Sequence, residues 1–436
     1  METSVDKYCR NRHLRISDLL ALRLLCLISF QTAVNQLHAV FPYGSRHFFS
    51  IMANTSKAKA ASLNLRVFPE YRKLLISGGL CVLLTRNLVC SKGNQNSRNA
   101  LMLLNRVLSH RHFFKKPSEL HVTCVESFKA HSSFIILVVF HPRLPLLATA
   151  SWDKTAKLWL LSPDRSSTSC VATLNGHSRD VFYVAFHPRM PLLATGSTDN
   201  TVKLWSLSSD YSATCVSTLT GQNCSVWSLA FHPTEPLLVT GNWDSKVRMW
   251  LLTPDNLSAT CEATLEGHKG YVASVVFNPT GQLIATSSID NTVKLWRLSS
   301  DLLSATCVAT LEGHTSLVTS VTFHHTMPLL ASSSNDKTTK LWRLSSDNLS
   351  ATCVATLEGH TKCVWSVVFH PMVQQLIVTC SKDKTIKLWW LSDDKSSATC
   401  VATLNGHNSD VRSVACHPTI PLIVSGSFDE TIRLWK

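Results

Sequence analysis

The sequence predicts an all-β protein built from seven copies of one four-stranded unit. A seven-residue motif that begins with Asp and ends with Trp, such as residues 290–296, occurs seven times. The seven closing tryptophans stand 45 to 47 residues apart, and self-similarity at a period of this size is typical of repeat architectures. Each copy also holds four short runs of alternating apolar and polar residues between turn residues, which is the pattern of β-strands.

The second copy shows the four runs clearly, at residues 170–177, 181–187, 192–197 and 201–205. A single sheet of four such strands cannot bury both of its faces by itself. We therefore expect neighbouring copies to stack on one another and to form the core between them.

A Gly-His pair lies about 22 residues before the turn Asp in most copies, as Gly176 and His177 do before Asp199. This order of Gly-His, Asp and Trp, repeated seven times, resembles the WD40 family over about residues 120–436. The resemblance implies a seven-bladed β-propeller of four-stranded blades. The repeats are expected at about 120–159, 166–205, 211–250, 257–296, 303–342, 349–389 and 396–435.

The resemblance also implies how the ring closes. In the family, one sequence repeat supplies the outer strand of one blade and the three inner strands of the next. This chain ends after a third inner strand, and its first outer strand begins at about residue 121. We expect that strand to pair with residues 431–436 and complete the last blade, which leaves only short, protected edges.

The recurring polar residues are expected to be structural, because they occur in every copy, whereas catalytic residues would set one copy apart. In the family, the His, Thr or Ser, Asp and Trp of each blade form a hydrogen-bonded network. In the third copy, Gln222 takes the place of the histidine, which predicts a less rigid blade. Three complete sets are His177, Thr195, Asp199 and Trp205; His268, Thr286, Asp290 and Trp296; and His314, Ser332, Asp336 and Trp342.

Positions that vary between the copies are candidates for binding. In WD40 propellers, three positions per blade build the top face around the central channel: those three and five residues after the Gly-His histidine, and the one before the turn Asp. Eight of these 21 residues are aromatic, although only 8% of the whole chain is aromatic. Aromatic residues near charges are typical of binding hot spots; the alternative is that the rings only pack on one another at the channel mouth. The expected partner-binding residues are Phe134, Trp152, Phe182, Trp227, Trp243, Tyr271, Trp365, Lys382, Arg412 and Phe428.

Seven of the fifteen cysteines occupy one equivalent repeat position. Repeats hold them too far apart to pair, because a disulfide needs Cα atoms within roughly 7 Å. We expect them to be small, buried, reduced side chains of a cytoplasmic or nuclear protein. The sequence contains no CxxC pair, so neither a metal nor a cofactor is expected. The seven are Cys124, Cys170, Cys215, Cys261, Cys307, Cys353 and Cys400.

Residues 1–119 account for most of the charge. The first 120 residues hold 18 Lys and Arg against 5 Asp and Glu, whereas the rest of the chain is close to balance. Such a basic region is suited to RNA or an acidic partner. Apolar residues at helical spacing over 14–41 and 101–114 predict a partly helical region. The apolar centre of the first run, residues 19–30, is shorter than the roughly 20 residues that a membrane span needs.

The sequence shows no phosphate-binding loop, no nucleophile elbow and no metal-ligand spacing. We therefore expect a non-enzymatic scaffold that binds a protein or peptide on the aromatic top face of the propeller. Two alternatives stay open. One is an RNA- or ribonucleoprotein-associated propeller that uses the basic N-terminal residues. The other is a substrate receptor of a ubiquitin ligase, although the chain contains no F-box pattern.

Overall fold

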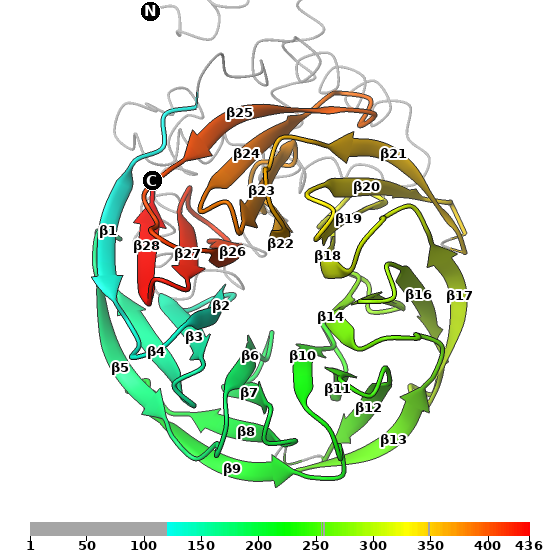
Figure 1. The fold of residues 1–436 in the computed structure, drawn as a ribbon. Coiled ribbons are helices and arrows are strands. Elements are labelled where there is room, and N and C mark those ends of the chain that lie inside the picture. The colour runs from blue at the N-terminus through cyan, green and yellow to red at the C-terminus, as the bar shows by residue number, and fades with distance from the viewer. Residues whose placement is uncertain (1–119, 254, 256–257, 348) are drawn as a thin grey trace, which may run out of the picture. The chain divides into compact units, whose positions relative to one another are not determined.

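The structure is a computed structural model that describes residues 120–436 except 254, 256–257 and 348. This part of the chain forms seven four-stranded antiparallel sheets, arranged as the blades of a β-propeller (Figure 1). The predicted fold class is confirmed, and the described residues contain no helix. The expected basic, partly helical region of residues 1–119 lies outside the described residues.

Each blade runs from an innermost strand at the central axis to an outermost strand at the rim, and blades 1 to 6 begin at β2, β6, β10, β14, β18 and β22. The innermost strands are β2 (Ile135–Phe140), β6 (Val181–Phe186), β10 (Val226–Phe231), β14 (Val272–Phe277), β18 (Val318–Phe323), β22 (Val364–Phe369) and β26 (Val411–Cys416). The second strands are β3 (Leu146–Ser151), β7 (Leu192–Ser197), β11 (Leu237–Asn242), β15 (Leu283–Ser288), β19 (Leu329–Ser334), β23 (Leu376–Ser381) and β27 (Ile423–Ser427).

The two outer layers follow the same order around the ring. The third strands are β4 (Ala156–Leu161), β8 (Val202–Leu207), β12 (Val247–Leu252), β16 (Val293–Leu298), β20 (Thr339–Leu344), β24 (Ile386–Leu391) and β28 (Thr431–Trp435). The outermost strands are β5 (Thr168–Leu174), β9 (Ala213–Leu219), β13 (Ala259–Leu265), β17 (Ala305–Leu311), β21 (Ala351–Leu357), β25 (Ala398–Leu404) and, for blade 7, β1 (Cys124–Lys129).

The ring closes through the first strand of the propeller. Blade 7 has the strand order β1-β28-β27-β26, so a strand from the start of the repeats completes the last blade (Figure 1). The register places Phe128 opposite Ile432, and the backbones of Thr123 and Lys436 exchange two hydrogen bonds of 2.9 Å. The predicted closure is confirmed. Closure pairs the free edge of β28, which would otherwise offer a template to other chains.

The apolar core lies between neighbouring blades, in seven clusters that follow the ring. Every residue of each second strand is buried, because a blade covers each face of the strand. Neighbouring blades approach closely at Gly196, where an added Cβ would lie 2.7 Å from the Cγ1 of Val226 in the next blade. Stacking therefore supplies the burial that one blade lacks.

The seven repeated cysteines are free, but the prediction that they are buried is wrong. All seven are exposed on the outermost strands. Each lies opposite the motif Trp of its blade, next to a β-bulge, as Cys170 lies opposite Trp159. Its thiol lies 3.7 Å from the carbonyl oxygen of Ala172. The repeated cysteine thus belongs to a bulge at the rim of the ring, where side chains reach solvent.

We predict that deleting residues 120–130 from the full chain opens the ring. The free edge of β28 and the uncovered face of blade 7 should lower the melting temperature and cause self-association, measured by thermal denaturation and size-exclusion chromatography.

The matched control replaces the six residues of β1 by their equivalents in blade 1, residues 170–175, which keeps the strand pattern and changes only side chains. This variant should remain monodisperse. A deletion variant as stable and as monodisperse as the wild type would contradict the closure mechanism.

Candidate functional site

The recurring polar residues form a continuous hydrogen-bonded chain inside each of six blades. In blade 1, the indole N–H of Trp159 donates to the hydroxyl of Thr149 over 3.0 Å. That hydroxyl lies 2.7 Å from Nε2 of His131, and Nδ1 of His131 lies 2.7 Å from a carboxylate oxygen of Asp153. The equivalent contacts join the three sets named from the sequence in blades 2, 4 and 5.

In blades 5 and 7 this chain has the residue order of a Ser-His-Asp catalytic triad. The hydroxyl of Ser332 lies 2.8 Å from His314, but Ser332 is completely buried and also accepts the indole N–H of Trp342. A nucleophile must reach its substrate. The geometry therefore makes the chain a structural brace of the blade.

The brace holds a strained turn in place. The residue after each turn Asp has a left-handed backbone, with φ between 67° and 73°, although none is a glycine. Asp153 stabilises its turn, because its carboxylate accepts both the backbone N–H and the hydroxyl of Thr155. Burial raises the pKa of Asp153, but hydrogen bonds from His131 and Thr155 outweigh it and hold that pKa below its usual range.

In blade 3, different residues hold the turn Asp in place. Gln222 replaces the histidine, and Arg248, where most blades have Lys, binds the carboxylate of Asp244 through contacts of 2.6 and 3.2 Å. Asn242 replaces the usual Ser. The amide nitrogen of Gln222 and the amide oxygen of Asn242 are buried without a hydrogen-bond partner in the described residues. Each such atom costs about 1–3 kcal/mol.

The histidines at the turns after the innermost strands are also structural, as the sequence predicted. Nδ1 of His187 accepts the backbone N–H groups of Arg189 and Met190 over 3.1 and 3.0 Å. Its ring lies 5.0 Å from that of Phe231 in the next blade. Burial lowers the pKa of His187 to about 4, and burial lowers the pKa of His141, His324, His370 and His417 to about 4 as well.

The residues that line the central channel include the extra residue of the β-bulge in each innermost strand. Each innermost strand carries one extra residue, five positions after the Gly-His histidine, with no partner in the ladder. A bulge re-aims its side chain, and all seven extra residues line a channel of about 220 Å³. They are Ile136, Phe182, Trp227, Ala273, Thr319, Trp365 and Arg412.

Seven of the expected binding residues lie side by side in one aromatic arc. Neighbouring rings in the arc have centroids 4.4 to 6.2 Å apart. Two of the pairs are stacked, Phe134 with Phe428 and Trp243 with Tyr271. The arc spans blades 7, 1, 2, 3 and 4, and consists in order of Phe428, Phe134, Trp152, Phe182, Trp227, Trp243 and Tyr271.

The rings of the arc differ in exposure, which the sequence did not predict. Trp243 and Trp152 remain 52% and 37% exposed, so they are available for binding. Phe182 was expected on the binding surface, but it is only 8% exposed, because it is a bulge residue packed at the channel against Trp227. Phe182 therefore supports the other rings.

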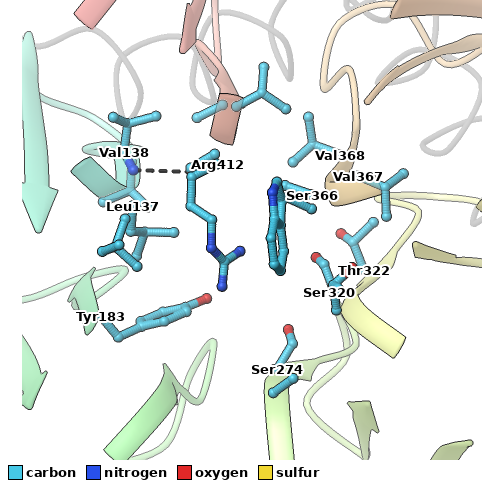
Figure 2. A pocket seen from close by; sticks show the side chains of 18 of the residues that line it. Leu137, Val138, Tyr183, Ser274, Ser320, Thr322, Ser366, Val367, Val368 and Arg412 are labelled. Carbon is cyan, nitrogen blue, oxygen red and sulfur yellow. Dashed lines mark hydrogen bonds between the residues drawn. The ribbon is translucent and has the colours of Figure 1, made fainter. Parts of the chain in front are cut away.

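The remaining expected residues lie in blades 6 and 7. The guanidinium carbon of Arg412 lies 4.3 Å from the ring centroid of Trp365, within cation–π distance. Figure 2 shows Arg412 reaching into the channel among Tyr183, Ser274 and Ser320. Burial lowers the pKa of Arg412. Lys382, which precedes the turn Asp of blade 6, is exposed.

The serines that follow the bulges were not predicted as functional residues from the sequence. Ser recurs at this position in five copies, which is the signal that would have found it. The Ser228 hydroxyl accepts the backbone N–H of Val275 in the next blade over 2.9 Å, and Ser413 likewise accepts that of Val138 over 3.2 Å. These bonds tie neighbouring innermost strands together around the channel.

The described residues of 120–436 offer neither a metal site nor a membrane-spanning helix. They contain no group of three or more His, Cys, Asp or Glu side chains that could hold a metal ion. No helix among them is long and apolar enough to cross a lipid bilayer.

The chain matches the sequence model of one protein family, described as WD domain, G-beta repeat. No curated protein sequence matches the chain closely enough to count as a relative. The family model matches seven times, at residues 122–159, 168–206, 213–250, 259–297, 305–343, 351–389 and 398–436.

We predict that acid destabilises the propeller between about pH 6.5 and pH 4. The turn histidines have a pKa near 4 when folded and near 6.5 when unfolded. In this window the unfolded chain binds more protons, so stability falls as the pH falls, by up to about 3 kcal/mol per histidine. Melting temperatures measured across this range should show the loss.

His187→Asn is the matched variant, because Asn278 occupies this position in blade 4 and its side-chain oxygen accepts a backbone N–H. This variant should lose stability less steeply with falling pH than the wild type. An unchanged slope would contradict the assignment of the titrating groups.

We predict that the triple variant Gln222→His, Asn242→Ser and Arg248→Lys stabilises blade 3. It restores the network of the other blades and removes two buried polar atoms that lack partners, so the free energy of unfolding should rise by about 1–3 kcal/mol. Denaturant unfolding measures the change. Gln222→His alone is the control, because it leaves Arg248 in competition for Asp244; a triple variant less stable than the wild type would refute the interpretation.

Proposed function

Because the chain belongs to the WD40 repeat family, whose propellers generally serve as scaffolds for protein interactions, we propose that it is a non-enzymatic scaffold that binds a short segment of a partner protein on its aromatic arc. The observation that carries the proposal is the exposure of Trp243 and Trp152 on top of five packed rings. We further propose that the binding takes place in the cytoplasm or nucleus, where exposed free thiols such as Cys170 stay reduced.

The arc has the physical features of a binding hot spot. Trp and Tyr supply large apolar areas at a low cost in conformational entropy, and hot spots cluster where such rings are held rigidly by neighbours. Trp243 stacks on Tyr271 at 4.4 Å with an interplanar angle of 8°, and both rings contact Trp227. The exposed rings are therefore pre-organised, which lowers the cost of binding.

The channel beside the arc favours a peptide over a small molecule. Ligand pockets for drug-sized molecules usually enclose about 300–1,000 Å³, whereas this channel encloses about 220 Å³. A space of this size accommodates one or two side chains. A peptide laid on the arc would fill it with a side chain and leave its backbone at the surface.

We predict that Trp152→Ala with Trp243→Ala weakens peptide binding at least tenfold and changes the melting temperature by less than about 3 °C. Both rings are exposed at the surface of the arc, so their loss should remove contact area more than core packing. Binding is measured on the full chain with peptides selected by the wild type from a random display library.

The matched control is Leu303→Ser with Leu349→Ser, which removes two exposed apolar side chains outside the arc. It should bind like the wild type. Equal binding by the tryptophan variant would refute the proposal. If instead RNA bound, with an affinity that fell steeply as salt rose, the RNA-associated alternative would replace it.

A further inference from the structure

Arg412 carries a charge inside the channel that no carboxylate of the described residues neutralises. With the described residues it forms no ion pair and no hydrogen bond, and its guanidinium carbon lies 4.3 Å from the ring centroid of Trp365. Asp410, two residues earlier, attracts it electrostatically without an ion pair. The Arg412 side chain is half-buried. A guanidinium that is partly withdrawn from water normally has a paired carboxylate or several acceptors, because desolvating a charge is costly.

Two further donors in the channel lining have no acceptor. The indole nitrogens of Trp365 and Trp227 are buried, and neither has a hydrogen-bond partner among the described residues. Both side chains line the same channel as Arg412. Buried polar atoms are rarely left unpaired in native structures. The channel thus combines one positive charge and two N–H donors, and all three lack a negative or acceptor partner.

We propose that the channel binds the carboxylate side chain of a Glu or Asp in the bound segment, with Arg412 as the cationic anchor and the indole N–H groups of Trp365 and Trp227 as further donors. This proposal rests on the proposed function, since it names the residue type that the segment presents. The planar guanidinium suits a carboxylate, to which it can donate two parallel hydrogen bonds.

The local charge favours a monoanion over a phosphate group. Among the described residues that line the channel, only Arg412 has a cationic side chain, and Asp410 already offsets part of its field. A phosphorylated side chain carries about −1.5 to −2 charges at neutral pH and is usually bound by clusters of Arg. A carboxylate, with one negative charge and two acceptor oxygens, matches the donors present.

The channel and the arc are continuous, so one segment reaches both. Trp227 and Phe182 line the channel, and both rings contact exposed members of the arc, Trp243 and Trp152 respectively. The recognised segment is therefore an acidic residue close in sequence to an apolar or aromatic one. Apolar contacts supply affinity, and the ion pair fixes the register.

The direct test is an NMR titration of the full chain labelled with ¹⁵N at its tryptophan indoles. The probe is Ac-Glu-NH₂, at up to about 50 mM, because a single ion pair is expected to bind in the millimolar range. Ac-Gln-NH₂ is the neutral isostere, and inorganic phosphate tests the other anion class. Trp365→Phe and Trp227→Phe assign the two signals.

We expect Ac-Glu-NH₂ to shift both signals in a saturable way, and Ac-Gln-NH₂ to leave them unchanged. Arg412→Met should abolish the shifts, and Arg412→Lys should weaken them. Arg412→Met should melt at the same temperature as the wild type or higher, because it removes a half-buried charge that has no paired carboxylate. Equal shifts with both probes, tighter binding of phosphate, or no shift at all would overturn the proposal.

Peptides that the wild type selects from the random display library test this proposal and the proposed function independently. A peptide with an acidic residue should lose at least tenfold in affinity for the wild type when that residue becomes Gln, and should lose nothing for Arg412→Met. Peptides that bind the arc without any acidic preference would refute the carboxylate site and leave the proposed function standing. Saturable Ac-Glu-NH₂ shifts with no peptide binding would refute the proposed function alone.

Discussion

The pairing of β1 with β28 is the constraint on which the rest of the structure depends. Each blade is a thin sheet with two apolar faces, and only a closed ring gives every face a neighbour. The core therefore has no centre of its own and is distributed over seven equivalent interfaces. Closure also brings the seven innermost strands around one axis, so that their bulge residues line a shared channel. The site exists because the ring is closed.

Much of this architecture follows from the sequence, because the period, the strand pattern and the recurring Asp and Trp are local and repeated. The positions of the top face also follow once the resemblance to the family is recognised. The exposure of each ring does not follow from the sequence, because it depends on packing between blades. Phe182 and Trp243 were both predicted on the top face. Phe182 is buried beside the channel, whereas Trp243 is half exposed.

Other differences between the expectations from the sequence and the structure have equally specific causes. The repeated cysteines looked like core residues because they are small and recur, but they lie at a bulge in the outermost strand, which only the register reveals. Gln222 looked like a defect of blade 3, yet Arg248 takes over the carboxylate that the missing histidine would hold. Both are pairings across strands, and a single sequence does not display them.

The repeated residues stabilise the blades, and the variable residues form the proposed binding site. The repeated residues satisfy one another: indole, hydroxyl, imidazole and carboxylate form a complete chain in six blades. The variable residues at the top and in the channel are left with exposed rings, a lone guanidinium and indole N–H groups that have no acceptor. Features that cost stability and are absent from most of the other blades are the expected marks of a binding site.

The most direct test is a substitution scan that measures folded abundance and peptide binding for every variant of the repeated network and of the 21 top-face positions. Substitutions in the network should lower the folded abundance, and peptide binding should fall only as much as the abundance falls. Substitutions at the exposed rings and at Arg412 should lower binding at unchanged abundance. If both sets of positions affected abundance and binding alike, scaffold and binding surface would not be separable, and the division between repeated and variable residues would be wrong.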